Sequence, residues 1–257
     1  MHVSQRLDMA VPPEMNDTVL AYVLKQMDYR EHDAIITVFT KEYGKLSFVS
    51  RGVRKMTSKN ASAVMPYTQS EILFDYKEHA TMFQLKSARC KEYYRYMHED
   101  MMASSAASVI AEIVDVFSLS EDSDQIYNMV GIAFDKLNNG YSSTLVVSLF
   151  LVDILRMAGL LPDVDACVVC GKQHVVTMSP KEGGFLCEDH ATNIPYIKAE
   201  DLRRFRILCK AGIDKIDVVT KYIEENINDL QYLLDILYLH ADIKLKTMKF
   251  YMHLNAL

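Results

Sequence analysis

Two short pairs of metal-binding residues constrain this chain more than any other feature. The first pair is Cys167 and Cys170, spaced C-x2-C and followed directly by Gly171. The second pair is Cys187 and His190, spaced C-x2-H, after an interval of sixteen residues. A tetrahedral Zn²⁺ site suits this arrangement, because each pair supplies two corners and the intervening chain folds back. The spacing therefore predicts a small hairpin finger that binds one Zn²⁺ per chain.

Other interpretations of the cysteines are open at this point. His174 competes with His190 as the fourth ligand, because it lies only four residues beyond Cys170. Free thiols are a second alternative. A redox C-x-x-C is disfavoured, since no strand–motif–helix unit surrounds the pair. Cys90 and Cys209 fall in predicted strand-edge or helical segments, and we interpret them as ordinary buried cysteines.

The predicted zinc site is closed, which argues against catalysis. A catalytic zinc keeps one coordination position open for water, whereas four protein ligands leave none. Zinc deaminases also need an H-x-E motif and a Pro before the first Cys. Here Ala166 precedes Cys167, and the chain contains no H-x-E, phosphate-loop or H-E-x-x-H motif. We therefore expect a structural metal in a protein that is not an enzyme and has no small-molecule substrate.

The first third of the chain has the pattern of short strands. The expected strands are Thr18–Met27, Ala34–Phe39, Leu46–Val53, Thr68–Tyr76 and Thr81–Lys86. In the third of these, apolar Leu46 and Phe48 alternate with Lys45, Ser47 and Arg51, as in a half-buried strand. Five short strands predict a small barrel. An OB-fold has this strand count, and an SH3-like barrel fits nearly as well.

After Lys91 the apolar residues recur at helical spacing. The expected helices are Met101–Leu119, Gln125–Leu137, Leu145–Ala158, Ala199–Ala211, Val218–Asn226 and Leu230–Lys246. The most apolar stretch, Leu145–Leu161, is interrupted by Asp153 and Arg156. It is also shorter than the roughly 20 residues of a membrane span. We expect a buried helix there and no membrane segment.

These patterns predict an α+β protein in which an OB-fold barrel precedes an all-helical domain. We expect an N-terminal extension at 1–17, the barrel at 18–90 and the helical domain at 91–257, with the zinc finger inserted at 166–191. Residues 1–17 contain no apolar core of a secretory signal. Five cysteines, an odd number, also favour the cytoplasm over a disulfide framework.

The net charge of −6 is unevenly distributed. Residues 41–59 contain a single acid, Glu42, and six basic residues: Lys41, Lys45, Arg51, Arg54, Lys55 and Lys59. An acidic protein with such a local basic stripe can bind a polyanion, with strong salt dependence. A solvated hairpin is the alternative, and composition alone does not separate the two.

Segments spread along the chain resemble those of the RecO proteins of bacterial DNA repair, in the same order. They are Tyr22–Lys25, Asp28–Asp33, Phe39–Lys45, Arg51–Lys55, Leu155–Pro162, Cys167–Gly171, Gly183–Cys187, His240 and Lys244–Phe250. They cover most of the chain from about Asp17 onward. In the resemblance, His190 stands where many members have a fourth Cys, and the first sixteen residues extend beyond the usual start.

The resemblance implies an N-terminal OB-fold, a helical domain and a zinc finger within that domain. It also implies a cytoplasmic, nucleoid-associated recombination mediator that binds single- and double-stranded DNA and anneals complementary strands. Such a protein assembles with RecR and helps RecA displace single-strand-binding protein from gapped DNA. The alternative function is a zinc-stapled scaffold for protein interactions that does not bind DNA.

Single-strand binding by OB-folds combines basic side chains for phosphates with aromatic faces for bases. The residues expected to contact phosphates are Lys45, Arg51, Arg54, Lys55 and Lys59. Tyr29 and Tyr43 are candidates for stacking, although each also fits a core or rim position. Near the C-terminus, Lys244, Lys246 and Lys249 could extend the DNA surface, receive an acidic peptide such as the tail of single-strand-binding protein, or be solvated.

Overall fold

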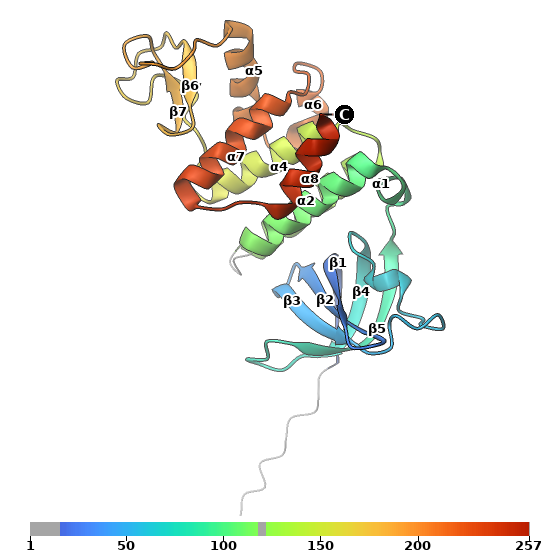
Figure 1. The fold of residues 1–257 in the computed structure, drawn as a ribbon. Helices are drawn as coiled ribbons and strands as arrows, with labels where there is room; N and C mark the ends of the chain where they lie inside the picture. Colours follow the sequence, from blue (N-terminus) through green and yellow to red (C-terminus); the bar gives the residue numbers. More distant parts are fainter. Residues whose placement is uncertain (1–15, 118–121, 257) are drawn as a thin grey trace, which may run out of the picture.

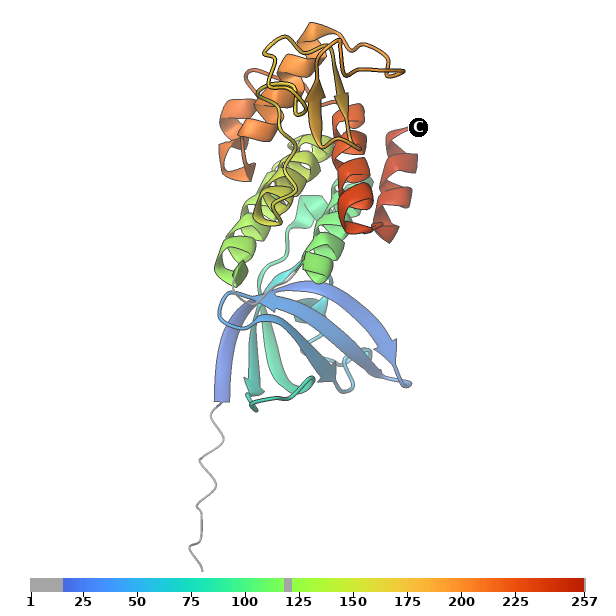
Figure 2. The same ribbon diagram turned by 90° about the vertical axis from the view of Figure 1, so that its left-hand side faces the viewer.

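The computed structural model describes residues 16–117 and 122–256. A barrel, a stack of helices and a small two-stranded unit follow one another along the molecule (Figure 1), and the same order is seen after a turn of 90° (Figure 2). The barrel strands are β1 (Asn16–Tyr29), β2 (Asp33–Thr40), β3 (Gly44–Ser50), β4 (Gln69–Asp75) and β5 (Phe83–Glu92). Residues 1–15 of the expected extension lie outside the described residues, and β1 already begins at Asn16.

The barrel is closed in the order β1-β2-β3-β5-β4. All neighbouring strands pair antiparallel except β3 and β5, which pair in parallel through Phe48 and Phe83. This five-stranded closed barrel is an OB-fold, which confirms the first of the two predicted barrel types. The alternation in β3 is also confirmed, because Leu46 and Phe48 are buried while Lys45 is exposed.

Eight helices of the described residues form the second domain. They are α1 (Arg95–Glu99), α2 (Met101–Phe117), α3 (Ser123–Asn138), α4 (Ser143–Met157), α5 (Ala199–Lys210), α6 (Ile216–Val219), α7 (Ile227–Ala241) and α8 (Lys246–Asn255). Every residue of α4 from Thr144 to Leu155 is buried, which confirms the predicted buried helix. Among the described residues, no helix is long and apolar enough to cross a membrane.

Two helix predictions were wrong at their ends. Of the helix expected at Val218–Asn226, only Val218 and Val219 are helical, at the end of the single turn α6. Asn226 instead caps α7 by accepting a hydrogen bond from the Asn228 N–H at 2.8 Å. The helix expected at Leu230–Lys246 breaks at Asp242, whose backbone is left-handed with φ of 54°. Glu112 of α2 then caps the new helix α8, accepting from the Lys246 and Thr247 N–H groups at 2.9 and 2.8 Å.

The barrel and the helices share one hydrophobic core. Tyr22 of β1 and Phe39 of β2 are buried among residues of α2, α3 and α4 rather than in the barrel interior. The Tyr22 ring lies 4.8 Å from that of Tyr127, and its hydroxyl accepts a hydrogen bond from Gln69 at 2.9 Å. Gly131 of α3 makes this approach possible, because a Cβ at this position would lie 2.6 Å from the Tyr22 hydroxyl oxygen.

Gly131 therefore provides a test of the shared core. An exposed Gly-to-Ala change in a helix stabilises by about 1 kcal/mol. We expect Gly131→Ala to destabilise instead, by roughly 1–3 kcal/mol, because the methyl group overpacks against Tyr22. Urea unfolding measures this change. In a Tyr22→Phe background, where the clashing oxygen is gone, Gly131→Ala should be neutral or stabilising, and additive effects of the two changes would contradict the interpretation.

Candidate metal centre and basic loop

Cys167, Cys170, Cys187 and His190 come together beside the two-stranded unit of β6 (Thr177–Ser179) and β7 (Gly184–Leu186). The three Sγ atoms and a ring nitrogen of His190 lie within 4.8 Å of one another. Cys170 Sγ is 3.7 Å from Cys187 Sγ, and His190 Nδ1 is 3.3 Å from Cys187 Sγ and 3.6 Å from Cys167 Sγ. Ligands about 2.0–2.3 Å from a tetrahedral metal are about 3.5–3.8 Å apart. The four side chains can therefore hold one metal ion.

Tight turns position the side chains of both pairs, Cys167 with Cys170 and Cys187 with His190, toward the cluster. Gly171 has a φ of +74°, which favours glycine, and its N–H donates to the Cys167 carbonyl at 2.8 Å. Cys187 directly follows β7, and its carbonyl accepts from the His190 N–H at 3.0 Å. The two-residue spacing within each pair thus becomes a turn that presents both side chains on the same side.

The electrostatics of the cluster favour a thiolate at Cys167, whereas the pKa of Cys170 is raised. Burial raises the pKa of the Cys167 thiol, but backbone N–H groups of Cys187, Cys170 and Val169 outweigh this and lower the pKa to about 6. The thiolate is the form that binds a metal ion. His174 is exposed and does not belong to the cluster.

The two-stranded unit that carries the Cys/His cluster is packed onto the helical domain. Phe185 of β7 lies with its ring 6.3 Å from Phe205 of α5, and Tyr232 of α7 donates to the Gly184 carbonyl at 3.4 Å. Gly184 cannot be replaced without movement, because a Cβ there would lie 2.2 Å from the Asp163 carbonyl oxygen. The unit's own core is small, centred on Cys167, Leu186, Cys187 and Ala191.

The basic loop, residues 51–60, follows β3 and is held at its base. Val53 is buried with the barrel core, and Gly52 has a φ of +63°. The Gly52 N–H donates to Asp33 Oδ1 at 2.8 Å, and the Arg54 N–H donates to the His32 carbonyl at 3.1 Å. The loop is therefore fixed to the β1–β2 hairpin.

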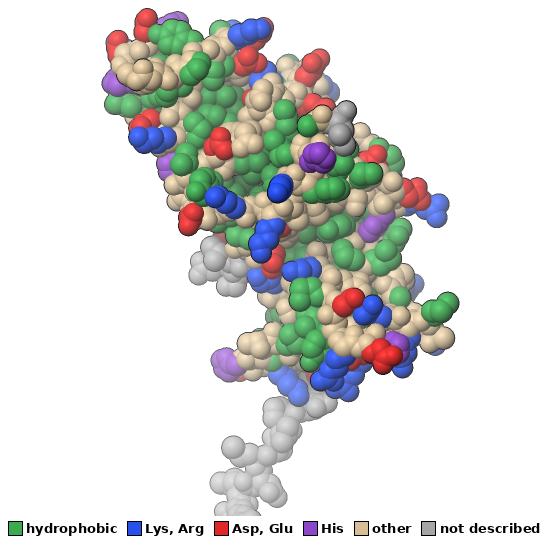
Figure 3. All heavy atoms as spheres, viewed as in Figure 1, with side chains coloured by type: hydrophobic (Ala, Val, Ile, Leu, Met, Phe, Trp, Pro, Cys, Tyr) green, Lys and Arg blue, Asp and Glu red, His purple; other side chains and the backbone are tan. Residues whose placement is uncertain are grey.

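Four of the five residues predicted to contact DNA lie on this loop and are exposed: Arg51, Arg54, Lys55 and Lys59. Arg54 Nη2 lies 3.1 Å from Asp28 Oδ2, in an ion pair that is largely exposed. The other three cations form no ion pair with any described residue. In Figure 3, Lys and Arg side chains are seen over the lower part of the barrel, with Asp and Glu side chains among them.

The fifth residue, Lys45, lies apart from the basic loop. Its ammonium group donates to Asp115 of α2, at 2.8 Å to the carbonyl and 3.0 Å to Oδ1. The neighbouring Lys41 carbonyl accepts from the Ser123 hydroxyl of α3 at 2.8 Å. This end of β2 thus faces the helices, whereas the basic loop is fixed to His32 at the other end.

The two tyrosines proposed for stacking also differ. Tyr29 is 37% exposed, and the Arg30 guanidinium carbon lies 5.1 Å from its ring centroid. Tyr43 is half-buried; its ring stacks on Tyr76 at 4.9 Å and its hydroxyl donates to Asp17 at 3.2 Å. Tyr29 is therefore the more accessible of the two rings.

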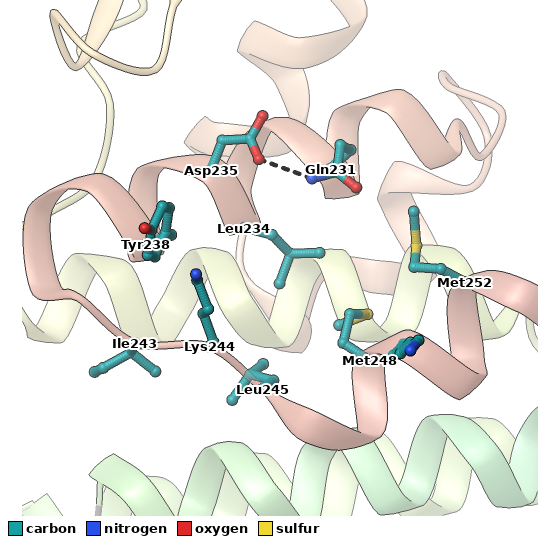
Figure 4. A pocket seen from close by; sticks show the side chains of 10 residues that line it. Gln231, Leu234, Asp235, Tyr238, Ile243, Lys244, Leu245, Met248 and Met252 are labelled. Atoms are coloured by element: carbon teal, nitrogen blue, oxygen red, sulfur yellow. Dashed lines mark hydrogen bonds between the residues drawn. The ribbon is translucent and has the colours of Figure 1, made fainter.

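Two of the three lysines near the C-terminus, Lys244 and Lys249, line a groove between α7 and α8, and Figure 4 shows Lys244 among the side chains that line it. Its volume is about 340 Å³. The lining residues are Gln231, Leu234, Asp235, Tyr238, Ile243, Lys244, Leu245, Met248, Lys249 and Met252. Lys244 Nζ lies 4.0 Å from the Tyr238 ring centroid. Lys246 is exposed at the start of α8 and does not line the groove.

Models of two protein families match the two halves of the chain. Recombination protein O N terminal matches residues 15–94, and Recombination protein O C terminal matches residues 98–249. The first match covers all of β1–β5, and the second covers the metal cluster and the helices up to the middle of α8.

Several curated proteins are similar over most of their length. DNA repair protein RecO of Lactiplantibacillus plantarum is 27% identical over 89% of this chain and 90% of its own. The proteins of the same name from Syntrophomonas wolfei and Halalkalibacterium halodurans are each 28% identical, over 84% and 71% of this chain and 87% and 74% of their own. With a closed OB-fold barrel, a helical domain and both family models in the expected order, the chain belongs to the RecO family of DNA repair proteins.

Proposed function

We propose that this protein is a recombination mediator that binds single- and double-stranded DNA through the phosphates, anneals complementary strands and, with a RecR-like partner, helps RecA load onto gapped DNA. The domain roles follow the expected division, with a DNA-binding barrel at 18–90 and a helical domain at 91–257 that carries the finger at 166–191. In this role the protein is not an enzyme.

The observation that carries the proposal is the basic loop. Its cations project from a barrel whose fold is widely used for single-stranded nucleic acids. Phosphate contacts position a strand without reading its sequence, as annealing of arbitrary strands requires. The loop is fixed by the hydrogen bonds of the Arg54 N–H to the His32 carbonyl and of the Gly52 N–H to Asp33 Oδ1, and by the buried Val53, so little ordering is needed on binding. We assign Arg51, Arg54, Lys55 and Lys59 to phosphate contacts, and Lys45 chiefly to holding the barrel on α2.

The loop assignment predicts a change in salt dependence. The double variant Arg54→Ala, Lys55→Ala should bind fluorescent single strands of unrelated sequence more weakly. Its slope of log affinity against log salt should fall by about 1.4, because two phosphate contacts at about 0.7 each are lost. Fluorescence anisotropy at several salt concentrations measures both quantities.

Two matched variants sharpen this experiment. Asp28→Asn releases Arg54 from its ion pair and should strengthen binding slightly. Lys198→Ala with Lys215→Ala removes the same charge from exposed positions on the helical domain and should leave the slope unchanged. If the loop and control variants changed the salt slope equally, the loop would have no special role in DNA binding. If the unaltered protein bound no DNA at low salt, the scaffold alternative would be favoured.

We also propose that the ion held by the metal cluster is a structural Zn²⁺, with Cys167, Cys170, Cys187 and His190 as its ligands. Three thiolates and an imidazole are donors that suit zinc, and they occupy all four tetrahedral positions. Since the finger has only a small core of its own, the ion would supply most of its local stability.

Metal analysis of the purified protein tests this proposal. We expect about one zinc per chain, and its loss in Cys187→Ser and in His190→Ala, because each removes one corner of the site. His174→Ala is the matched control and should retain the zinc. Limited proteolysis should then cut the zinc-free finger while the barrel stays resistant. Full zinc occupancy in His190→Ala would refute the ligand set.

For the α7–α8 groove we propose an acidic peptide as the occupant, such as the tail of single-strand-binding protein. Apolar Leu234, Met248 and Met252 line it and would receive an apolar residue, while Lys244 and Lys249 would pair with carboxylates. A synthetic acidic peptide ending in an apolar residue should bind to the full chain and lose affinity in Lys249→Glu. Lys246 lies outside the groove. An equal loss of peptide affinity in Lys246→Glu would show that the peptide responds to the overall charge and not to the groove.

A further inference from the structure

A second cleft lies where the barrel meets the helices, about 400 Å³ in volume. Tyr67 comes from the segment before β4, His98 and Glu99 from α1, and Phe250 from α8. Met101 and three serines of α2 complete the lining: Ser104, Ser105 and Ser108. Figure 1 shows α1, α2 and α8 together above the barrel. Its volume is in the lower range of small-ligand sites.

Two polar atoms of this cleft are buried without a partner. Ser105 is only 5% exposed, and neither its Oγ nor His98 Nε2 has a hydrogen-bond partner among the described residues. Four such buried side-chain atoms occur in the described part of the chain, and two of them line this one cleft. An unpaired buried polar group costs free energy that a ligand can recover by pairing with it. Both atoms are closed to solvent in this conformation, so a ligand with hydrogen-bonding groups would reach them with a rotation of the side chain.

The remaining lining is flat and aromatic. The His98 ring stacks on Tyr93, with ring centroids 4.5 Å apart at 17°, and it lies 6.3 Å from the Tyr67 ring. Phe250 is 55% exposed at the edge. Tyr67 has a left-handed backbone with φ of 66°, a strained conformation for a non-glycine residue. The aromatic walls suit a planar ligand.

The charge of the residues that line the cleft disfavours a ligand that inserts a negatively charged group. The cleft has Glu99 and contains no Lys or Arg among its lining residues. Burial lowers the pKa of His98, so that its imidazole is neutral near pH 7. A serine hydroxyl and a neutral imidazole can each donate or accept according to the partner. A neutral planar ring with adjacent donors and acceptors matches these properties.

We infer that this cleft binds one unstacked nucleobase, that Ser105 and His98 turn their unpaired Oγ and Nε2 atoms to the base edge on binding, and that Tyr67 and Phe250 make the aromatic contact. Proteins recognise splayed-out bases by combining aromatic contact with hydrogen bonds to the base edge. The inference rests on the proposed function for the source of the base, which would be a DNA strand. It adds a non-ionic contact, separate from the phosphates held by the basic loop.

Nucleosides test the cleft without phosphate. Thymidine and deoxyadenosine are titrated into the full-length protein while the His98 ring proton is followed by NMR, with its resonance assigned by its loss in His98→Gln. We expect at least one nucleoside to shift this resonance saturably, while His174 and His240 stay unchanged. Deoxyribose alone should have no effect. No His98 shift with any nucleoside, or an equal shift with deoxyribose, would overturn the inference.

Ser105→Ala separates ligand binding from stability. It removes a buried hydroxyl that has no partner, so the free energy of unfolding should stay unchanged or rise. Nucleoside affinity should fall by roughly tenfold, the size of one lost hydrogen bond to a buried group. Unchanged affinity would overturn the assignment of Ser105. The double variant Arg54→Ala, Lys55→Ala should keep nucleoside binding while its DNA binding weakens. If the unaltered protein showed the His98 shift but bound no DNA strand, the result would count against the proposed function and not against the cleft.

Discussion

The packing of Tyr22 against α3 is the contact on which the arrangement of the molecule depends. The barrel has an interior of its own, built around Phe48, Phe74 and Ile72. Tyr22 and Phe39, however, are turned outward into the core of the helical domain. Because Gly131 lets the Tyr22 hydroxyl approach α3 closely, the two domains meet over a buried surface rather than through a linker alone. Surfaces on the barrel and on the helices therefore keep a fixed relation.

Because the barrel is held on the helices in this way, the candidate sites lie at different places along the molecule. The β2–β3 hairpin faces the helices through Lys41 and Lys45, so the basic loop at the other end of β2 stays open. The nucleobase cleft lies at the junction, and the two-stranded unit that carries the Cys/His cluster lies beyond α5 and α7. The basic loop and the cleft of His98 and Ser105 thus lie on different parts of the molecule, and the proposed DNA strand would pass from one to the other.

The features that sequence reasoning found are those governed by local spacing. Two C-x2 pairs indicate a candidate metal site because each pair needs one turn. The alternation of Leu46 and Phe48 with Lys45 and Ser47 indicates a half-buried strand, but β3 ends at Ser50 and not at the expected Val53. Sequence reasoning could not separate Lys45 from the other loop cations, because its contact with Asp115 joins positions seventy residues apart. The break at Asp242 was missed for a similar reason: Glu112, which caps α8, is distant in the sequence.

His98 and Ser105 show why the cleft left no trace in the sequence. Neither belongs to a motif, and both lie in or near a segment whose apolar spacing indicates an ordinary helix. They stand out because Ser105 Oγ and His98 Nε2 have no hydrogen-bond partner among the described residues. This depends on how Tyr67, α1, α2 and α8 pack together, which the sequence does not reveal. Loop cations act through long-range charge and lose strength as salt rises. A neutral cleft is insensitive to salt, so its share of the total affinity grows as ionic strength increases. A mediator with both surfaces would hold a strand at salt concentrations where phosphate contacts alone release it.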